Sequence, residues 1–180
     1  RAQSLIHGDL HTGSIFINEE STKVFDPEFC FYGPMGYDIG NVIANMIFAW
    51  ANGDAAGAAD FCKWVEDVLV DVINMTKEKM EKYYDEHVTD TMCRNELYKK
   101  YYMDTIIEDT SAVAGLELIR RIVGMANVKD ITTIADEAKR ARAEKICITA
   151  AIDFIKNRSD KKCGKCFLKT LKDAIAEVDA

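Results

Sequence analysis

Most of the chain places hydrophobic residues three and four positions apart, which is the spacing of an amphipathic helix. The first such stripe follows Asp38, a residue type that favours the start of a helix. This stripe comprises Ile39, Val42, Ile43, Met46, Ile47 and Trp50. A second stripe comprises Phe61, Trp64, Val65, Val68, Leu69, Val72 and Ile73. The pattern predicts helices from Asp38 onward and over residues 56–83, 96–126, 133–156 and 166–178, with a break near residues 111–115.

The first thirty residues have a different pattern, with short β-rich runs at Ser14–Ile17 and Lys23–Asp26. A segment of turn composition separates the two runs, so this region predicts a β-hairpin. A polar loop with two glycines precedes the hairpin, and an irregular loop with both prolines follows it. The expected fold class is mainly α (α+β), with a small β-hairpin at the N-terminal edge of a helical body.

The composition argues against several classes of protein. The chain has 180 residues, a hydrophobic fraction of 48% and a formal net charge of −7. No hydrophobic run approaches the roughly 20 residues that span a bilayer, so we expect no membrane partner. Net acidity disfavours binding of nucleic acid, which usually requires a basic surface. Residues 156–172 carry seven basic residues against one acidic residue, and we interpret them as a solvated, partly frayed terminal segment.

The chain contains six cysteines, at positions 30, 62, 93, 147, 163 and 166. Their scattered positions favour a reduced, cytoplasmic protein over a disulfide framework. Cys163 and Cys166 form a C-x-x-C motif, but a zinc site would need two further ligands and no second pair lies nearby. A redox pair would normally open a helix behind a strand, whereas the surrounding sequence resembles a charged linker. We therefore interpret these two residues as free thiols.

Asp9 and Asp26 flank the predicted hairpin, seventeen positions apart. A strand, a turn and a returning strand bring both ends to one place, so both carboxylates are expected at the same mouth. Glu28 adds a third carboxylate beyond the rigid Pro27. Such a cluster is costly unless a divalent metal or a basic side chain joins it. Hard oxygen ligands of this kind suit Mg²⁺ or Mn²⁺.

Nucleotide-dependent phosphoryl transfer uses this set of groups. One carboxylate accepts the proton of the attacking hydroxyl, and others hold the metal that bridges the phosphates. A structural interpretation is open for each fragment alone: His7 as a core histidine, Gly8 as a turn residue and Asp26-Pro27-Glu28 as a helix start. The presence of both fragments around a hairpin of the correct length favours the catalytic interpretation.

Two stretches carry a specific resemblance. His-Gly-Asp-Leu-His-Thr-Gly-Ser-Ile-Phe at 7–16 and Asp-Pro-Glu-Phe-Cys-Phe-Tyr-Gly-Pro-Met-Gly-Tyr-Asp-Ile-Gly-Asn at 26–41 resemble the methylthioribose kinase family. That family belongs to the aminoglycoside-phosphotransferase and choline-kinase branch of the protein-kinase-like fold. Ser14 stands where the wider branch has a metal-binding Asn, and Asp26-Pro27-Glu28 replaces its Asp-Phe or Asp-Trp. Both departures match the methylthioribose kinase pattern, and the resemblance extends to about Arg158.

The resemblance implies a reaction and a set of catalytic groups. Asp9 would be the catalytic base, Asp26 and Glu28 would hold Mg²⁺ (or Mn²⁺), and Ser14 would be a weaker additional ligand. The implied reaction transfers the γ-phosphoryl group of ATP to the 1-hydroxyl of 5-methylthioribose, a step in methionine salvage.

Five further residues receive roles from the same resemblance. His7 and Asp38 would support the catalytic loop, and His11 would orient its backbone or line the sugar site. Arg120 and Arg121 would contact the sugar substrate.

From the residues alone, an alternative role is equally favoured for the two arginines. It is an ion pair with the acidic Glu108-Asp109 or with Glu117.

Only eight residues precede Asp9, so we expect the N-terminal ATP-binding lobe to be absent. Residues 1–158 would form the C-terminal lobe, and residues 159–180 a basic extension with a short helix. By the resemblance, the full-length protein would be a homodimer that uses ATP and methylthioribose, and the isolated chain would be inactive. The alternatives are another small-molecule kinase of the same branch, acting on an aminoglycoside, choline or homoserine, and a non-catalytic helical dimerisation module.

Overall fold

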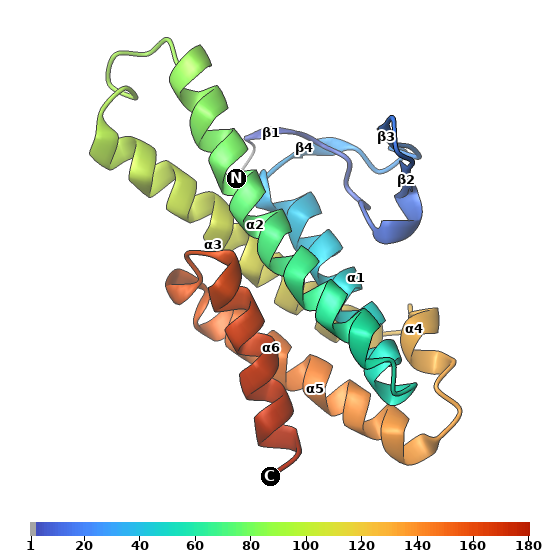
Figure 1. Cartoon of the computed structure of the whole chain (residues 1–180). Helices are drawn as coiled ribbons and strands as arrows, with labels where there is room; N and C mark the ends of the chain where they lie inside the picture. The colour runs from blue at the N-terminus through green and yellow to red at the C-terminus, as the bar shows by residue number, and fades with distance from the viewer. Residues whose placement is uncertain (1–2) are drawn as a thin grey trace.

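A computed structural model describes residues 3–180 as a helical body that carries a small β unit (Figure 1). The strands are β1 (Ser4–Ile6), β2 (Ile15–Ile17), β3 (Thr22–Val24) and β4 (Phe31–Gly33). The helices are α1 (Gly36–Ala55), α2 (Ala59–His87), α3 (Glu96–Ile122), α4 (Lys129–Thr132), α5 (Glu137–Lys156) and α6 (Gly164–Val178). Two 3-10 turns, η1 (Thr12–Ser14) and η2 (Arg158–Asp160), complete the order. The mainly helical fold with a hairpin is therefore confirmed.

The hydrophobic core lies between α1, α2, α3, α5 and α6, and its largest fully buried side chains include Phe48, Phe154 and Phe167. Helix α1 lies unusually close to α3. A Cβ at Gly36 would lie 2.5 Å from the carbonyl oxygen of Ile106, and one at Gly40 would lie 2.7 Å from that of Thr110. This close packing fixes the first turn of α1, and that turn lies beneath the β unit.

The four strands form two nested antiparallel pairs. Inside, β2 pairs with β3 with Ile15 opposite Val24, which confirms the predicted hairpin. Outside, β1 pairs with β4 with Ile6 opposite Phe31, a pairing that the hydrophobic pattern did not predict. Residues 7–14 and 25–30 connect the outer pair to the inner pair on its two sides. The nesting therefore places these two loops opposite each other.

Several helix boundaries differ from the predictions. Helix α1 begins at Gly36 with Met35 before it, so Asp38 lies inside the first turn and does not cap the helix. Helix α3 is continuous through residues 111–115. The range 133–156 contains only α5, which starts at Glu137 after Asp136 caps it by accepting a hydrogen bond from the Lys139 backbone N–H.

The second predicted stripe is only partly buried. Val65, Leu69 and Ile73 are in the core, whereas Phe61 and Trp64 are 42% and 59% exposed. Their rings stack on each other at a centroid distance of 5.8 Å. Periodicity therefore identified helix α2 correctly but overestimated the length of its buried face.

The C-terminal segment is not frayed, so that interpretation is wrong. Helix α6 packs against α5 and α2 and buries Phe167 and Leu171 completely. Three lysines of this segment are paired with acidic residues of other helices: Lys161 with Asp153, Lys162 with Glu108, and Lys172 with Glu66. These ion pairs offset part of the local positive charge that the sequence alone shows.

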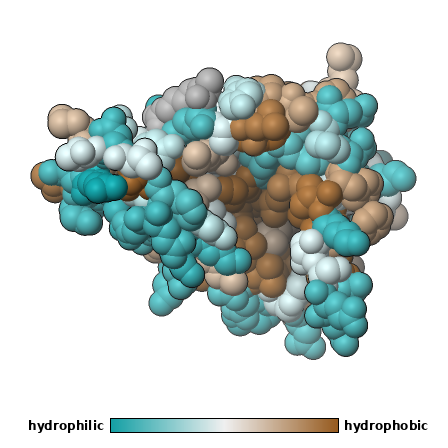
Figure 2. Space-filling model, turned by 90° about the horizontal axis from the view of Figure 1, so that it is seen from above, coloured by the Kyte–Doolittle hydropathy of each residue, from teal (hydrophilic) through white to brown (hydrophobic). Residues whose placement is uncertain are grey.

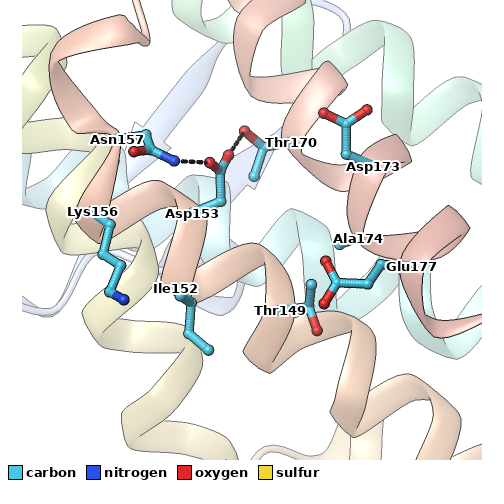
Figure 3. A pocket seen from close by; sticks show the side chains of 9 residues that line it. All are labelled: Thr149, Ile152, Asp153, Lys156, Asn157, Thr170, Asp173, Ala174 and Glu177. Atoms are coloured by element: carbon cyan, nitrogen blue, oxygen red, sulfur yellow. Dashed lines mark hydrogen bonds between the residues drawn. The ribbon is translucent and has the colours of Figure 1, made fainter.

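A polar cleft of about 340 Å³ is lined by residues of both α5 and α6. Figure 3 shows Asp153 at one end of the cleft, where it accepts hydrogen bonds from Asn157 and Thr170, each at 2.6 Å. Among residues 3–180, no helix is long and apolar enough to cross a membrane.

Candidate active site

The two connecting loops of the β unit contact each other directly. The His7 ring donates from Nε2 to the carbonyl oxygen of Phe25, at 2.8 Å. Gly8 has a φ of +87°, and a Cβ there would lie 2.1 Å from the carbonyl oxygen of Phe29. Only glycine fits this conformation and this approach without strain. Asp9 is therefore held on a loop that lies against the loop of Asp26 and Glu28.

The carboxylate of Asp38 fixes the loop that carries Asp9. Its two oxygens accept hydrogen bonds from the backbone N–H groups of His7 and Gly8, at 2.6 Å and 3.0 Å. Hydrogen bonds to an ionised acceptor are stronger than neutral ones. Because Asp38 belongs to the first turn of α1, these bonds tie the loop to the closely packed helices α1 and α3.

His11 organises the next turn of the same loop. Its Nδ1 accepts the backbone N–H of Gly13 at 3.0 Å, so in the neutral ring the proton lies on Nε2, which is 3.1 Å from the hydroxyl of Ser14. Ser14 is only 4% exposed. The ring thus has a clear structural contact. The roles of Ser14 as a metal ligand and of His11 at the sugar remain predictions.

Asp26 has a strained backbone. Its φ of +67° is the only positive value among the non-glycine residues that the structure describes. A left-handed conformation is unfavourable for most side chains, and such strain is concentrated at functional sites. Pro27 follows directly, and both Asp26 and Glu28 are exposed. The strain gives Asp26 a signal of function that is independent of sequence motifs.

The expected cluster of three carboxylates is not formed. Among residues 3–180, no group of three His, Cys, Asp or Glu side chains is close enough to hold a metal ion. Asp9, Asp26 and Glu28 therefore do not gather into one metal-binding cluster, and the expectation of a three-carboxylate cluster is wrong. Mg²⁺ is usually held by one or two carboxylates together with water and substrate phosphates. The exposed oxygens of Asp26 and Glu28 fit this kind of incomplete site.

The two arginines of α3 share one buried carboxylate. Glu117 accepts hydrogen bonds from Arg120 at 2.6 Å and 2.9 Å and from Arg121 at 2.7 Å. Burial raises the pKa of the Glu117 carboxyl, but the hydrogen bonds and charges of both arginines outweigh this effect and hold its pKa below the usual value. The ion pair with Glu117, one of the two roles considered from the sequence, is therefore present.

Arg120 is also within electrostatic range of Asp9. The hydrogen bond to Glu117 is the main cause that raises the pKa of Arg120, and the negative charge of Asp9 adds to the rise. The side chain of Arg120 is 51% exposed even though it is paired. An ion pair and a role at the site are therefore compatible for this residue.

The helical body, the nested β unit and the braced aspartate loop are those of a kinase-like C-terminal lobe. Residues 1–69 match the family model described as the phosphotransferase enzyme family.

Individual relatives show a more specific similarity than the family model does. Methylthioribose kinase 1 of Oryza sativa subsp. japonica is 38% identical, in an alignment that covers 88% of this chain and 40% of that protein. Methylthioribose kinases of Bacillus pumilus and Escherichia coli are 37% and 34% identical, over 86% and 87% of this chain. Over most of its own length the chain is therefore similar to methylthioribose kinases, and its first 69 residues match the phosphotransferase enzyme family. It spans about 40% of the length of these relatives.

Sequence reasoning missed the outer β1–β4 pair, for which the short β-rich run at Phe31–Gly33 was an available signal. It left the acidic partner of the two arginines open, and the structure selects Glu117. The spacing of three and four positions from Glu117 to Arg120 and Arg121 is that of neighbours on a helix, which favours this partner over Glu108-Asp109.

Proposed function

We propose that this chain supplies the catalytic and sugar-binding part of a methylthioribose kinase. The reaction moves the γ-phosphoryl group of ATP to the 1-hydroxyl of 5-methylthioribose. The similarity to methylthioribose kinases over 88% of the chain carries this proposal. The hydrogen bonds of Asp38 to the loop of Asp9 support it, because a positioned carboxylate is what phosphoryl transfer requires.

In this proposal Asp9 orients the sugar hydroxyl and accepts its proton as the bond to phosphorus forms. Asp26 and Glu28 would hold Mg²⁺, and the ion when bound neutralises charge on the phosphate oxygens. Arg120 and Arg121 bind sugar hydroxyls, and Arg120 adds positive charge near the transferring group. Glu117 holds both guanidinium groups in place by accepting their hydrogen bonds.

Exposed apolar surface on the β unit supports a further part of the proposal. Leu5, Phe16, Ile17 and Tyr32 are each more than 60% exposed. Figure 2 also shows hydrophobic residues in a hollow on the face seen from above. Large hydrophobic side chains that are exposed on one small unit often mark a contact surface. We infer that other segments of the full-length kinase, together with ATP, cover this side, and that the isolated chain is inactive.

The test is an ADP-release assay on the full-length protein that contains this chain, with ATP, Mg²⁺ and a panel of acceptors. We expect turnover with methylthioribose and none with an aminoglycoside, choline or homoserine. Asp9→Asn should lower kcat at least a thousandfold, whereas Asp71→Asn, at an exposed position of α2, should leave it unchanged. Preference for another acceptor would refute the substrate, and near-normal turnover of Asp9→Asn would refute the role of Asp9.

Two further measurements test the remaining parts. The purified 180-residue chain should release no ADP above background, and ordinary turnover would refute its inactivity. Light scattering of the full-length protein should give the mass of a homodimer. If the chain were only a dimerisation module, Asp26→Asn would not change Mn²⁺ binding by the full-length protein, whereas a metal-holding role predicts weaker binding.

A further inference from the structure

The two cysteines of the C-x-x-C motif are in contact at the start of α6. Cys163 is the residue before the helix, and Cys166 lies in its first turn. Their sulfur atoms are 3.0 Å apart, and both side chains are partly exposed. The sequence suggested a charged linker at this place, but the motif in fact opens a packed helix.

The backbone around the two sulfur atoms is fixed by neighbouring helices. The N–H of Gly164 donates to the side-chain oxygen of Asn74 at 2.9 Å. A Cβ at position 164 would lie 2.3 Å from the carbonyl oxygen of Val70, so α6 begins directly against α2. A disulfide needs a sulfur–sulfur distance of about 2.05 Å. The two sulfur atoms therefore need to approach each other by only about 1 Å to form the bond.

The segments on both sides of the motif are held by one carboxylate of α5. Asp153 accepts a hydrogen bond from Lys161, two residues before Cys163, at 2.5 Å. It also accepts one from Thr170, on the next turn of α6 after Cys166 (Figure 3). The two thiols therefore meet because of the tertiary fold, and their proximity does not depend on a flexible tail.

The surroundings also favour the reactive, ionised form of one thiol. Cys166 lies in the first turn of a helix, where backbone N–H groups stabilise negative charge. Partial burial raises the pKa of Cys166, but hydrogen bonding from Cys163 and from nearby backbone groups, together with the charge of Lys161, lowers the pKa below its usual value. A thiolate beside a second thiol is the arrangement that thiol–disulfide exchange requires.

We propose that Cys163 and Cys166 form a reversible dithiol–disulfide centre that exchanges with low-molecular-weight disulfides. The thiolate of Cys166 attacks a disulfide RSSR and forms a mixed disulfide, with release of RS⁻. The thiol of Cys163 then loses its proton and attacks the sulfur of Cys166, which releases the second RS⁻. The two thiol protons of the protein end on the two RSH molecules. The protein is oxidised by two electrons and RSSR is reduced.

The other cysteines provide internal comparisons. Cys62 and Cys147 are buried, and burial raises the pKa of Cys147 to about 12, so neither thiol should react readily. Cys93 is partly exposed, as the two proposed residues are, but no hydrogen bond joins it to another cysteine among residues 3–180. Cys93→Ser is therefore a matched control.

The test equilibrates the folded chain, without oxygen, in glutathione buffers that range from fully reduced to fully oxidised. Samples are quenched with acid, denatured, alkylated with N-ethylmaleimide and weighed by mass spectrometry. We expect six alkylated cysteines in the reduced chain and four after oxidation, with a peptide map that joins Cys163 to Cys166. Cys93→Ser, which keeps five cysteines, should likewise lose two alkylation sites on oxidation.

Cys166→Ser and Cys163→Ser should not lose a pair of sites, because each leaves only one thiol at the centre. The peptide map of the unmodified chain tests the proposal even if a variant fails to fold. The proposal is overturned if the chain keeps all six alkylation sites in every buffer. It is equally overturned if the map joins other cysteines.

Discussion

Glu117→Gln tests whether the buried carboxylate of α3 holds the two arginines. The substitution keeps the size of the side chain and removes its negative charge. Glu117 is 6% exposed, whereas the side chains of Arg120 and Arg121 are 51% and 20% exposed. The change therefore leaves two positive charges beside a neutral amide, and both of these charges retain some contact with water.

The expected loss of stability caused by Glu117→Gln lies between two limits. Breaking a fully buried ion pair costs about 3–5 kcal/mol, and an exposed pair contributes about 0–1 kcal/mol. Because the glutamate is buried and the arginines are only partly buried, we expect the free energy of unfolding to fall by about 2 kcal/mol. For a chain of this size, this corresponds to a decrease in Tm of about 4–8 °C.

The sign of the pH dependence follows from the pKa of Glu117. Its pKa is lower in the folded chain than the value of 4.5 that is usual for glutamate. The stabilisation is therefore present above about pH 4.5 and is lost as the pH falls through the folded-state pKa. The difference in stability between the two proteins should consequently shrink as the pH is lowered from 7 to 4.

Urea unfolding at several pH values measures both effects. Glu144→Gln is the matched control, because Glu144 forms a pair with Arg140 at 4.0 Å in which both side chains are more than one-third exposed. It should change stability by less than about 0.5 kcal/mol. In the full-length protein, Glu117→Gln should raise KM for the sugar more than it lowers kcat. A loss of stability equal to that of the control, or one that does not depend on pH, would refute the reasoning.

Gly8→Ala should destabilise the chain by more than Gly57→Ala, because a Cβ at Gly8 would lie 2.1 Å from a carbonyl oxygen, whereas a Cβ at Gly57 would have nothing within 4 Å. Both glycines have a positive φ, so the difference between the two variants in urea unfolding measures the effect of the clash. Phe154→Ala should lower the free energy of unfolding by about 3–5 kcal/mol, since its side chain is fully buried, and a loss below 1 kcal/mol would contradict its place in the core. Burial raises the pKa of Cys147 to about 12, so this thiol should resist iodoacetamide at pH 8 in the folded chain while the exposed Cys30 reacts. Equal labelling rates would contradict the burial of Cys147 in α5.

The sequence by itself determined the local elements. Alternation and turn residues between Ser14 and Asp26 fixed the inner hairpin, because side-chain period and turn chemistry are local properties. The three- and four-residue spacing likewise located the main helices, and the motif around Asp9 indicated the chemistry. The spacing did not locate the ends of the helices as well. Asp38 is of a residue type that often caps a helix, but both of its carboxylate oxygens accept hydrogen bonds from the loop of His7 and Gly8.

Only the tertiary structure decided which distant groups meet. The β1–β4 pair places the loops of Asp9 and Asp26 against each other, and Asp26 adopts its positive φ in one of these loops. The basic C-terminal segment packs against the helical body, and helices far away in sequence supply Glu108 and Glu66 as partners of Lys162 and Lys172. A local pattern shows which face of a helix is hydrophobic. The partner for that face, and for each charge beside it, depends on contacts between segments that lie many residues apart.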